Sequence, residues 1–310
     1  MQKLKFNRKR SNKIKSNKIS LNLDFKHNIH ELEDLTKNPN ITSRLTGAYL
    51  SKFKGQGIEF EEYKEYIYGE DDANKIDWVA SNKTTSLLVK KFKTQRSTNV
   101  IIALDTSKSM FFSSSNKLKC EYAAELAASL SFAIIESKDN VGLAIFNKGI
   151  KKFIPPANSL DHYFKLLNEL QNEDNYFYEK DYIQTFKKLG EMIVEKDVLL
   201  FIISDFSQLH KEQLEYLDIL CAGFDITGFL IKDPVEENLP KKGLYSLNDP
   251  FSSSHILIDS QKIKDLYHKE YRKNIFRLKN HFLEKENDLV EISMSKDSES
   301  QIMEYFIAQK

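Results

Sequence analysis

Four apolar runs, each of strand length, constrain the fold of this chain more than any other feature. They lie at 99–105 (NVIIALD), 140–147 (NVGLAIFN), 197–206 (DVLLFIISDF) and 225–233 (DITGFLIKD). A strand that is apolar on both faces has to be covered on both sides, which is the usual situation of parallel strands in α/β proteins. These runs therefore predict the central strands of a mainly parallel sheet.

Predicted helices alternate with these strands. The segment 117–138 is rich in Ala and Leu, with apolar residues spaced three and four apart, and further helices are predicted at 159–171, 181–196 and 208–222. Alternation of this kind predicts a doubly wound α/β domain with right-handed crossovers. Ligands of such folds gather at the carboxyl ends of the strands, so functional residues are expected there.

The overall composition is that of an ordinary globular protein. Hydrophobic residues make up 41% and charged residues 29% of the chain, and a net charge of +1 gives it no strong preference for nucleic acid or an anionic membrane. No apolar window approaches the ~20 residues of a membrane span, and no leader pattern follows the basic start. We expect Cys120 and Cys221 to be buried thiols in a reducing compartment, and hence a cytoplasmic protein.

The start of the chain is strongly basic. Residues 1–20 carry eight Lys and Arg and no acidic residue. We expect a solvated, disordered tail over residues 1–27, with contact to an acidic partner, RNA or a membrane surface as the alternative. A helical pattern at 28–39 follows and is predicted to end at Pro39.

Two of the apolar strands are followed by, or end on, a carboxylate. Asp105 ends the first run, Asp205 follows FIIS in the third, and Ser107 and Ser109 come soon after Asp105. If both strands are central and parallel, these oxygens meet at one edge of the sheet and suit Mg²⁺ or Mn²⁺, with coordination positions left for an outside carboxylate. The simpler alternative is that Asp105 and Ser107 cap the following turn or helix. The matching Asp205 favours the metal site.

The motif DTSKSM at 105–110, followed later by FIISDF at 201–206, resembles the metal-ion-dependent adhesion site of von Willebrand factor A domains. The block at 45–92, with its glycines, EF, EY and IDW elements, resembles that of the MoxR-associated bacterial proteins grouped as the domain of unknown function number 58. The segment 233–250 follows the pattern of the same proteins. The resemblance spans about residues 44–305, nearly the whole chain.

This resemblance implies a von Willebrand factor A or Rossmann-like α/β fold and a particular set of metal ligands. Asp105, Ser107 and Ser109 would bind Mg²⁺ or Mn²⁺, and Asp205 would act directly or through water. The family pattern places a Thr in a further loop, where this chain has Lys180 followed by Asp181. A lysine there would oppose a cation, so we expect the metal to be bound weakly, to use Asp181 instead, or to be lost.

The resemblance also implies a division of the chain. After the tail at 1–27, residues 28–96 would form a small, β-rich, family-specific subdomain. Residues 97–310 would form the von Willebrand factor A-like domain, with a hairpin at 243–259 and helices at its C-terminal end. Trp78 is the only tryptophan, and we interpret it as a packing anchor of the subdomain rather than as a binding platform.

The function implied is that of a non-catalytic adaptor that works with a MoxR-type AAA+ ATPase in the assembly or remodelling of protein complexes. The bound ion would hold an Asp or Glu of a client protein, and no small-molecule substrate is expected. One alternative is a metal-dependent hydrolase that uses the same oxygen cluster, although Asp105 and Asp205 are few carboxylates for two-metal chemistry. Another is a nucleic-acid-associated factor that uses the basic tail, which the net charge makes a weaker candidate.

Overall fold

The computed structural model describes residues 39–53, 60–69, 71–84, 86–92, 97–114, 117–195, 197–207, 209–237, 239, 243–248 and 255–308. Its centre is a six-stranded sheet with the order β10-β7-β6-β3-β4-β5. The strands are β3 (Asn99–Asp105), β4 (Asn140–Phe146), β5 (Ile150–Ala157), β6 (Val198–Ser204), β7 (Asp225–Lys232) and β10 (Asp288–Ser293). All neighbouring pairs are parallel except β4 and β5, so the predicted mainly parallel sheet is confirmed.

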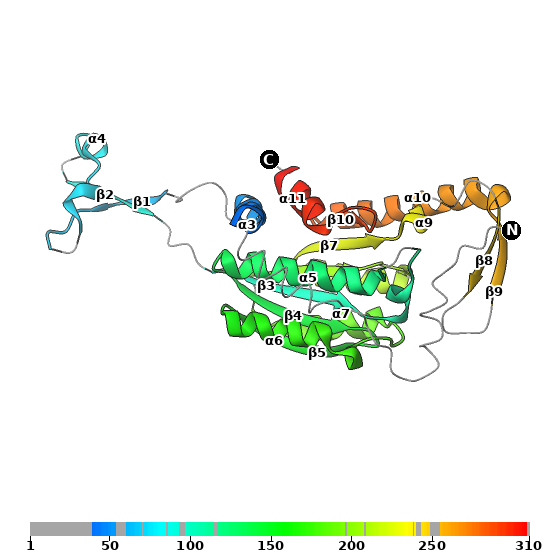
Figure 1. Cartoon of the computed structure of the whole chain (residues 1–310). Coiled ribbons are helices and arrows are strands. Elements are labelled where there is room, and N and C mark those ends of the chain that lie inside the picture. Colours follow the sequence, from blue (N-terminus) through cyan, green and yellow to red (C-terminus); the bar gives the residue numbers. More distant parts are fainter. Residues whose placement is uncertain are drawn as a thin grey trace.

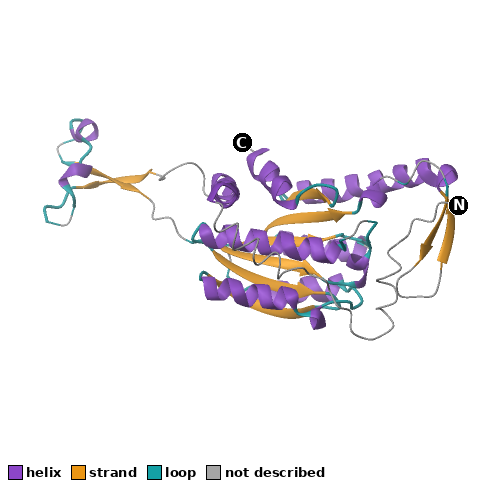
Figure 2. Cartoon of the chain, viewed as in Figure 1, coloured by secondary structure: helices purple, strands orange, loops and turns teal. Residues whose placement is uncertain are grey.

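Helices cover both faces of this sheet (Figure 2). The helices on one face are α3 (Pro39–Phe53), α5 (Lys119–Glu136), α6 (Leu160–Gln171) and α11 (Ser298–Ala308), and those on the other are α7 (Tyr182–Met192), α8 (Lys211–Cys221) and α10 (Ser260–Glu284). The central strand β3 contributes side chains to the hydrophobic cores on both faces of the sheet. Its residues Val100, Ile102 and Leu104 join one core, while Ile101 and Ala103 join the other, because successive side chains of a strand point to opposite faces.

The edge strand β5 contains two consecutive prolines. It continues through Pro155 and Pro156 to Ala157. An edge strand tolerates proline because one side of its backbone has no neighbouring strand to hydrogen-bond. The pairing with β4 is irregular here, and a Cβ at Gly142 would lie 2.7 Å from the carbonyl oxygen of Ile154, so this close approach requires glycine.

The helix α3 belongs to the α/β core. The Tyr49 hydroxyl donates to Asp139 at 3.0 Å, and the ring of Phe53 lies 5.7 Å from that of Phe201 in the central sheet. The ammonium of Lys52 pairs with Asp288 of β10 at 2.7 Å. The predicted subdomain at 28–96 is therefore divided, because its first described helix packs on the sheet. The helix predicted at 28–39 was expected to end at Pro39, but Pro39 begins α3 instead. The rest of that predicted helix and the tail lie outside the described residues.

The rest of that block forms a projection, which we call the arm (residues 60–69, 71–84 and 86–92). It consists of the antiparallel hairpin β1 (Phe60–Glu65) and β2 (Leu88–Phe92), with a 3-10 turn at Ala73–Lys75 and the short helix α4 (Trp78–Ser81). The arm extends away from the sheet (Figure 1). Trp78 is 62% exposed, so its interpretation as a packing anchor is wrong.

The remaining elements follow β7. The short helix α9 (Pro234–Glu237) comes first, and the hairpin predicted at 243–259 is present as β8 (Leu244–Asn248) and β9 (His255–Asp259). Two 3-10 turns lie near the carboxyl edge of the sheet, at Lys108–Phe111 and Glu173–Asn175. These turns and α9 complete the rim at which the candidate residues meet.

Candidate functional site

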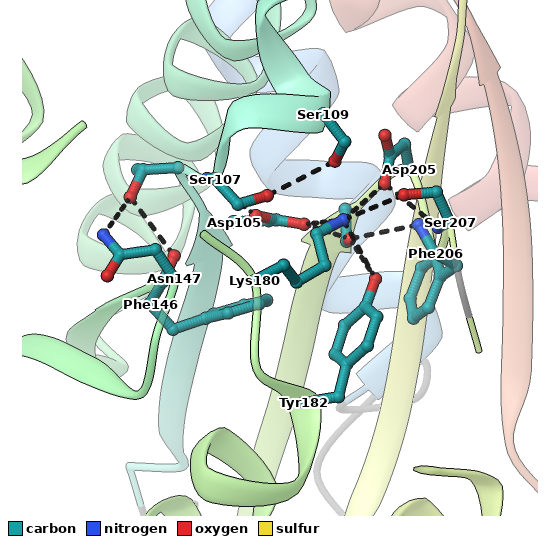
Figure 3. Close-up of polar contacts among 12 residues, drawn as sticks. Asp105, Ser107, Ser109, Phe146, Asn147, Lys180, Tyr182, Asp205, Phe206 and Ser207 are labelled. Atoms are coloured by element: carbon teal, nitrogen blue, oxygen red, sulfur yellow. Dashed lines mark hydrogen bonds and ion pairs between the residues drawn. The ribbon is translucent and has the colours of Figure 1, made fainter. Parts of the chain in front are cut away.

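The two predicted carboxylates lie together at the carboxyl edge of the sheet. Asp105 is the last residue of β3, and Asp205 directly follows β6, which is the parallel neighbour of β3. Parallel neighbours end at the same edge, so both side chains reach the same place. Figure 3 shows that they converge on one atom, the Nζ of Lys180.

Lys180 bridges the two strands. Its Nζ lies 2.7 Å from Oδ2 of Asp105 and 2.6 Å from Oδ1 of Asp205. It also donates to the hydroxyls of Ser207 at 3.2 Å and Tyr182 at 3.3 Å. The Lys180 side chain is 5% exposed, so this ammonium is a buried cation surrounded by oxygen atoms.

A second lysine completes the cluster. Lys119 is the first residue of α5, and its Nζ lies 3.2 Å from Oδ2 of Asp205 and 2.8 Å from Oε1 of Glu236 in α9. Its side chain is 2% exposed. We call Asp105, Lys119, Lys180 and Asp205 the charge cluster. Two carboxylates and two ammonium groups give it a formal charge of zero, with Glu236 at its border.

Each carboxylate oxygen of the cluster has a donor from the chain itself. Asp105 accepts from the backbone N–H of Ser107 at 2.9 Å through Oδ1, and from the Ser204 hydroxyl at 2.6 Å through Oδ2. Asp205 accepts from the backbone N–H of Ser207 at 3.0 Å through Oδ1, while its Oδ2 faces Lys119. Buried charges are tolerated only when they are paired and hydrogen-bonded in this way.

The pKa shifts follow from this arrangement. Burial by itself would lower the pKa of Lys180, but the carboxylates of Asp105 and Asp205 outweigh it and raise that pKa well above its usual value. For Asp205, burial would raise the pKa, but Lys180 and Lys119 outweigh it and hold the pKa far below its usual range. Lys180 and Asp205 are therefore both charged at neutral pH.

The backbone around Asp205 is constrained. Phe206 adopts a φ of 46°, in the left-handed region that bulky residues rarely occupy. Its N–H donates to the Ser204 hydroxyl at 3.0 Å, and the same hydroxyl donates to Asp105. Ser204 also lies 3.0 Å from the Tyr182 hydroxyl, so one serine side chain joins both strand ends to the start of α7.

The two predicted serines lie close to Asp105. The hydroxyl oxygens of Ser107 and Ser109 are 3.3 Å apart, and Ser107 is fully buried. The segment before α7 holds this loop in place, since the N–H of Lys108 donates to the carbonyl of Tyr178 at 2.9 Å. The predicted grouping of Asp105, Ser107, Ser109 and Asp205 at one edge is thus present in the structure.

Asp181 has a different role from the one considered in the sequence. Its carboxylate accepts from the N–H of Gln184 at 3.0 Å and caps α7. Thr185 is the threonine nearest in the chain to position 180, where the family pattern has a Thr. Its hydroxyl donates to the carbonyl of Asp181 at 2.7 Å. Both side chains are therefore engaged in starting α7, while the preceding Lys180 enters the cluster.

The donor set as arranged does not fit the divalent cation that the resemblance implies. Mg²⁺ binds oxygens at about 2.0–2.1 Å and requires a near-octahedral shell. The Lys180 ammonium lies between the two carboxylates, 2.7 Å and 2.6 Å from the oxygens that a shared ion would use. Among the residues that the structure describes, no three His, Cys, Asp or Glu side chains are arranged to hold a metal ion.

Sequence reasoning named Asp105, Asp205 and Lys180 but missed four other residues around them. Lys119, Tyr182, Ser204 and Glu236 were not predicted to take part. Lys119 carries a weak signal, because a lysine in the first turn of a helix opposes the helix dipole and needs a compensating anion. Ser204 directly precedes Asp205 and Tyr182 follows Lys180 by two residues, so their positions in the chain were a signal that could have been used. Glu236 reaches the cluster only through the tertiary fold.

The elements above define a mixed α/β protein with a six-stranded, mostly parallel sheet and a lysine-bridged carboxylate pair at its carboxyl edge. Residues 62–276, more than half of the chain, match the family described as "Protein of unknown function DUF58". The chain belongs to this family, which confirms that part of the sequence resemblance.

Curated relatives match a smaller part of the chain. It is similar to the uncharacterized protein Mb1516 of Mycobacterium bovis and to the uncharacterized protein Rv1480 of Mycobacterium tuberculosis. Each is 25% identical over 137 residues, which is 44% of this chain and 43% of the relative. The chain thus spans less than half the length of these curated relatives.

Similar solved structures include the conserved hypothetical protein BatB from Bacteroides thetaiotaomicron, with a TM-score of 0.42, and an aerotolerance-related membrane protein from Bacteroides fragilis, with a TM-score of 0.43. Each is 14% identical and covers 68% of this chain, with 98% and 100% of the other chains covered. In the part of this chain that the structure describes, no helix combines the length and the apolar character needed to cross a membrane.

Proposed function

We propose that this chain is a non-catalytic adaptor that binds other proteins at the carboxyl edge of its sheet. The proposal rests on one observation: lysine side chains of the same chain neutralise both carboxylates. Asp105 and Asp205 face Lys180, and Asp205 also faces Lys119, so neither is available as a general base. Hydrolysis by two metal ions would need these same oxygens as ligands.

The von Willebrand factor A-like assignment belongs to this proposal. It is supported by the parallel sheet with helices on both faces and by the meeting of Asp105, Ser107 and Asp205 at one edge. The partner we propose, on the basis of the sequence resemblance, is a MoxR-type AAA+ ATPase acting on a client protein in the cytoplasm. The energy for remodelling would come from that ATPase, and this chain would supply the contact.

The carboxyl edge offers exposed side chains to such a partner. Tyr178 lies two residues before Lys180 in the chain, and its side chain is 42% exposed. The Lys151 ammonium lies 4.6 Å from the centroid of its ring. Lys108 pairs with Glu179 at the same edge. Ligands of open α/β sheets bind outside the carboxyl ends of the strands, so we assign the contact to this edge rather than to the arm.

The test is capture of a purified MoxR-type ATPase on the immobilised full chain. Tyr178→Ala at the rim is compared with Tyr68→Ala on the arm, where the tyrosine is 92% exposed. We expect capture by the wild type, a loss of about tenfold or more in Tyr178→Ala, and no change in Tyr68→Ala. Absence of capture by the wild type, or a loss confined to Tyr68→Ala, would contradict the proposal.

The same preparation tests the alternatives. Phosphatase or nuclease turnover that Asp105→Asn abolishes would favour the metal-dependent hydrolase. Binding of nucleic acid with a steep salt dependence, lost when residues 1–19 are removed, would favour the nucleic-acid-associated factor. The adaptor proposal expects neither activity.

A further inference from the structure

The Lys180 ammonium lies where a shared cation of the two strand tips would be expected. It contacts Oδ2 of Asp105 and Oδ1 of Asp205 at 2.7 Å and 2.6 Å, one oxygen from each strand. A metal ion that joined these two strands would use the same pair of oxygens. The chain therefore supplies its own positive charge at this position, from the residue directly before α7.

The oxygens around the ammonium fulfil its hydrogen-bonding capacity. Besides the two carboxylates, the hydroxyls of Ser207 and Tyr182 lie at 3.2 Å and 3.3 Å. An ammonium group has three N–H donors, and four oxygen atoms surround it here. With 5% of its side chain exposed, Lys180 is enclosed much as an ion would be by its ligands.

The charge balance leads to the same conclusion. Lys119 adds a second positive charge at 3.2 Å from Asp205, so the two carboxylates are matched by two ammonium groups. A divalent cation in addition would give the four residues of the cluster an excess of two positive charges, of which the bordering Glu236 could offset only one. Uncompensated buried charge is strongly unfavourable, so a metal ion would first have to displace Lys180.

We propose that Lys180 is the resident cation of this site and replaces the divalent ion, so that the site forms and the protein works without metal. The inference concerns the site itself and does not rest on the proposed partner. It also removes the mechanism in which a bound ion holds a client Asp or Glu, because a neutral, enclosed cluster has no open coordination position.

The first experiment measures Mn²⁺ binding to the full-length wild-type protein by electron paramagnetic resonance, together with thermal unfolding in Mn²⁺ and in EDTA. We expect no saturable Mn²⁺ binding at millimolar metal and the same unfolding midpoint in both solutions. Saturable binding to the wild type that is lost in Asp105→Asn would overturn the proposal. The expected result, the absence of saturable binding, is read from the wild type alone and does not depend on the stability of any variant.

The second experiment exchanges the internal cation for an oxygen. Lys180→Thr removes the ammonium and supplies a hydroxyl, so the carboxylates should now accept a metal ion. We expect saturable Mn²⁺ binding and a midpoint about 5 °C higher in saturating Mn²⁺ than in EDTA. The matched control is Lys108→Thr, which removes a nearby lysine paired with Glu179 rather than with the cluster.

The control variant should behave like the wild type, without Mn²⁺ binding or a metal-dependent midpoint. A Lys180→Thr protein that folds but binds no Mn²⁺ would contradict the idea that the ammonium occupies a cation position. Equal Mn²⁺ binding by both lysine variants would contradict it as well. None of these results depends on capture of the ATPase, so failure of this inference and failure of the proposed function are distinguishable.

Discussion

The charge cluster and the arm both contain an ion pair between Lys and Asp, but in opposite environments. In the cluster, Lys180 and Asp105 have side chains that are 5% and 0% exposed and lie 2.7 Å apart. On the arm, Lys90 and Asp77 lie 2.9 Å apart, and their side chains are 44% and 14% exposed. The same chemical pair is enclosed in one region and partly open to water in the other.

This difference changes what each pair does. Breaking a buried pair leaves a charge without water or a counter-ion, whereas water replaces the lost partner of an exposed pair. The cluster should therefore contribute to global stability, while the arm pair should affect local structure only. A ranked series of substitutions tests this comparison.

Lys180→Met should have the largest effect. It leaves Asp105 buried without its cation, and we expect the free energy of unfolding to fall by about 3–5 kcal/mol. Urea unfolding followed by far-ultraviolet circular dichroism measures this change. The control is Lys108→Met, at the same edge but partly exposed, which should change little. Equal effects of the two substitutions would refute the distinction between buried and exposed lysines.

Lys119→Met should have a smaller effect. Asp205 keeps its contact with Lys180, and Glu236 lies at the border of the cluster with a side chain that is 28% exposed, so solvent can compensate part of the loss. We expect a decrease of about 2 kcal/mol in the free energy of unfolding, measured in the same way. A loss larger than that of Lys180→Met would mean that Lys119 is the principal counter-ion.

Tyr182→Phe should come third. The hydroxyl accepts from Lys180 at 3.3 Å and lies 3.0 Å from the Ser204 hydroxyl, while the ring remains packed in the core. Loss of these bonds should lower the free energy of unfolding by about 1 kcal/mol. The same change at the exposed Tyr178 is the control and should be neutral. No difference between the two variants would show that the Tyr182 hydroxyl adds nothing to the cluster.

Asp77→Asn on the arm should have the smallest effect. Its carboxylate pairs with Lys90 and caps α4 by accepting from the N–H groups of Val79 and Ala80 at 3.0 Å each. We expect an unchanged global unfolding midpoint, because the arm projects from the sheet (Figure 1).

The fluorescence of Trp78 provides a local signal for this arm variant. Trp78 is the only tryptophan and follows Asp77 directly, so its emission should report the arm alone. Acrylamide should quench it readily in the wild type, because the side chain is 62% exposed. A large shift of the global midpoint in Asp77→Asn would show that the arm is coupled to the core.

The sequence was sufficient for the parts of the fold that depend on local pattern. The run at 99–105 became β3 with the same bounds, since a continuous apolar segment of only seven residues favours a buried strand over a helix. Asp105 and Asp205 were expected at one edge because parallel neighbours end together, and the structure places them there. Their arrangement follows directly from strand topology.

The contacts of the charge cluster could not be predicted from the sequence, because they depend on the direction in which long side chains point. Lys180 was expected to oppose a cation, but its position in the chain does not show that its ammonium would turn inward and bind both carboxylates. Lys119 is separated from Asp205 by 86 residues and meets it only through the fold. Trp78 shows the reverse error, because a large aromatic residue suggests burial although this one projects into solvent.

The position of the arm relative to β3 has a further consequence. The arm precedes β3 in the chain, and the chain enters this strand at Asn99 and leaves it at Asp105 in the cluster. The arm therefore connects to one end of β3 and the cluster lies at the other (Figure 1). Seven residues of strand span about 23 Å. The arm is thus joined to the end of β3 that lies away from the charge cluster, so one strand connects the two regions compared above.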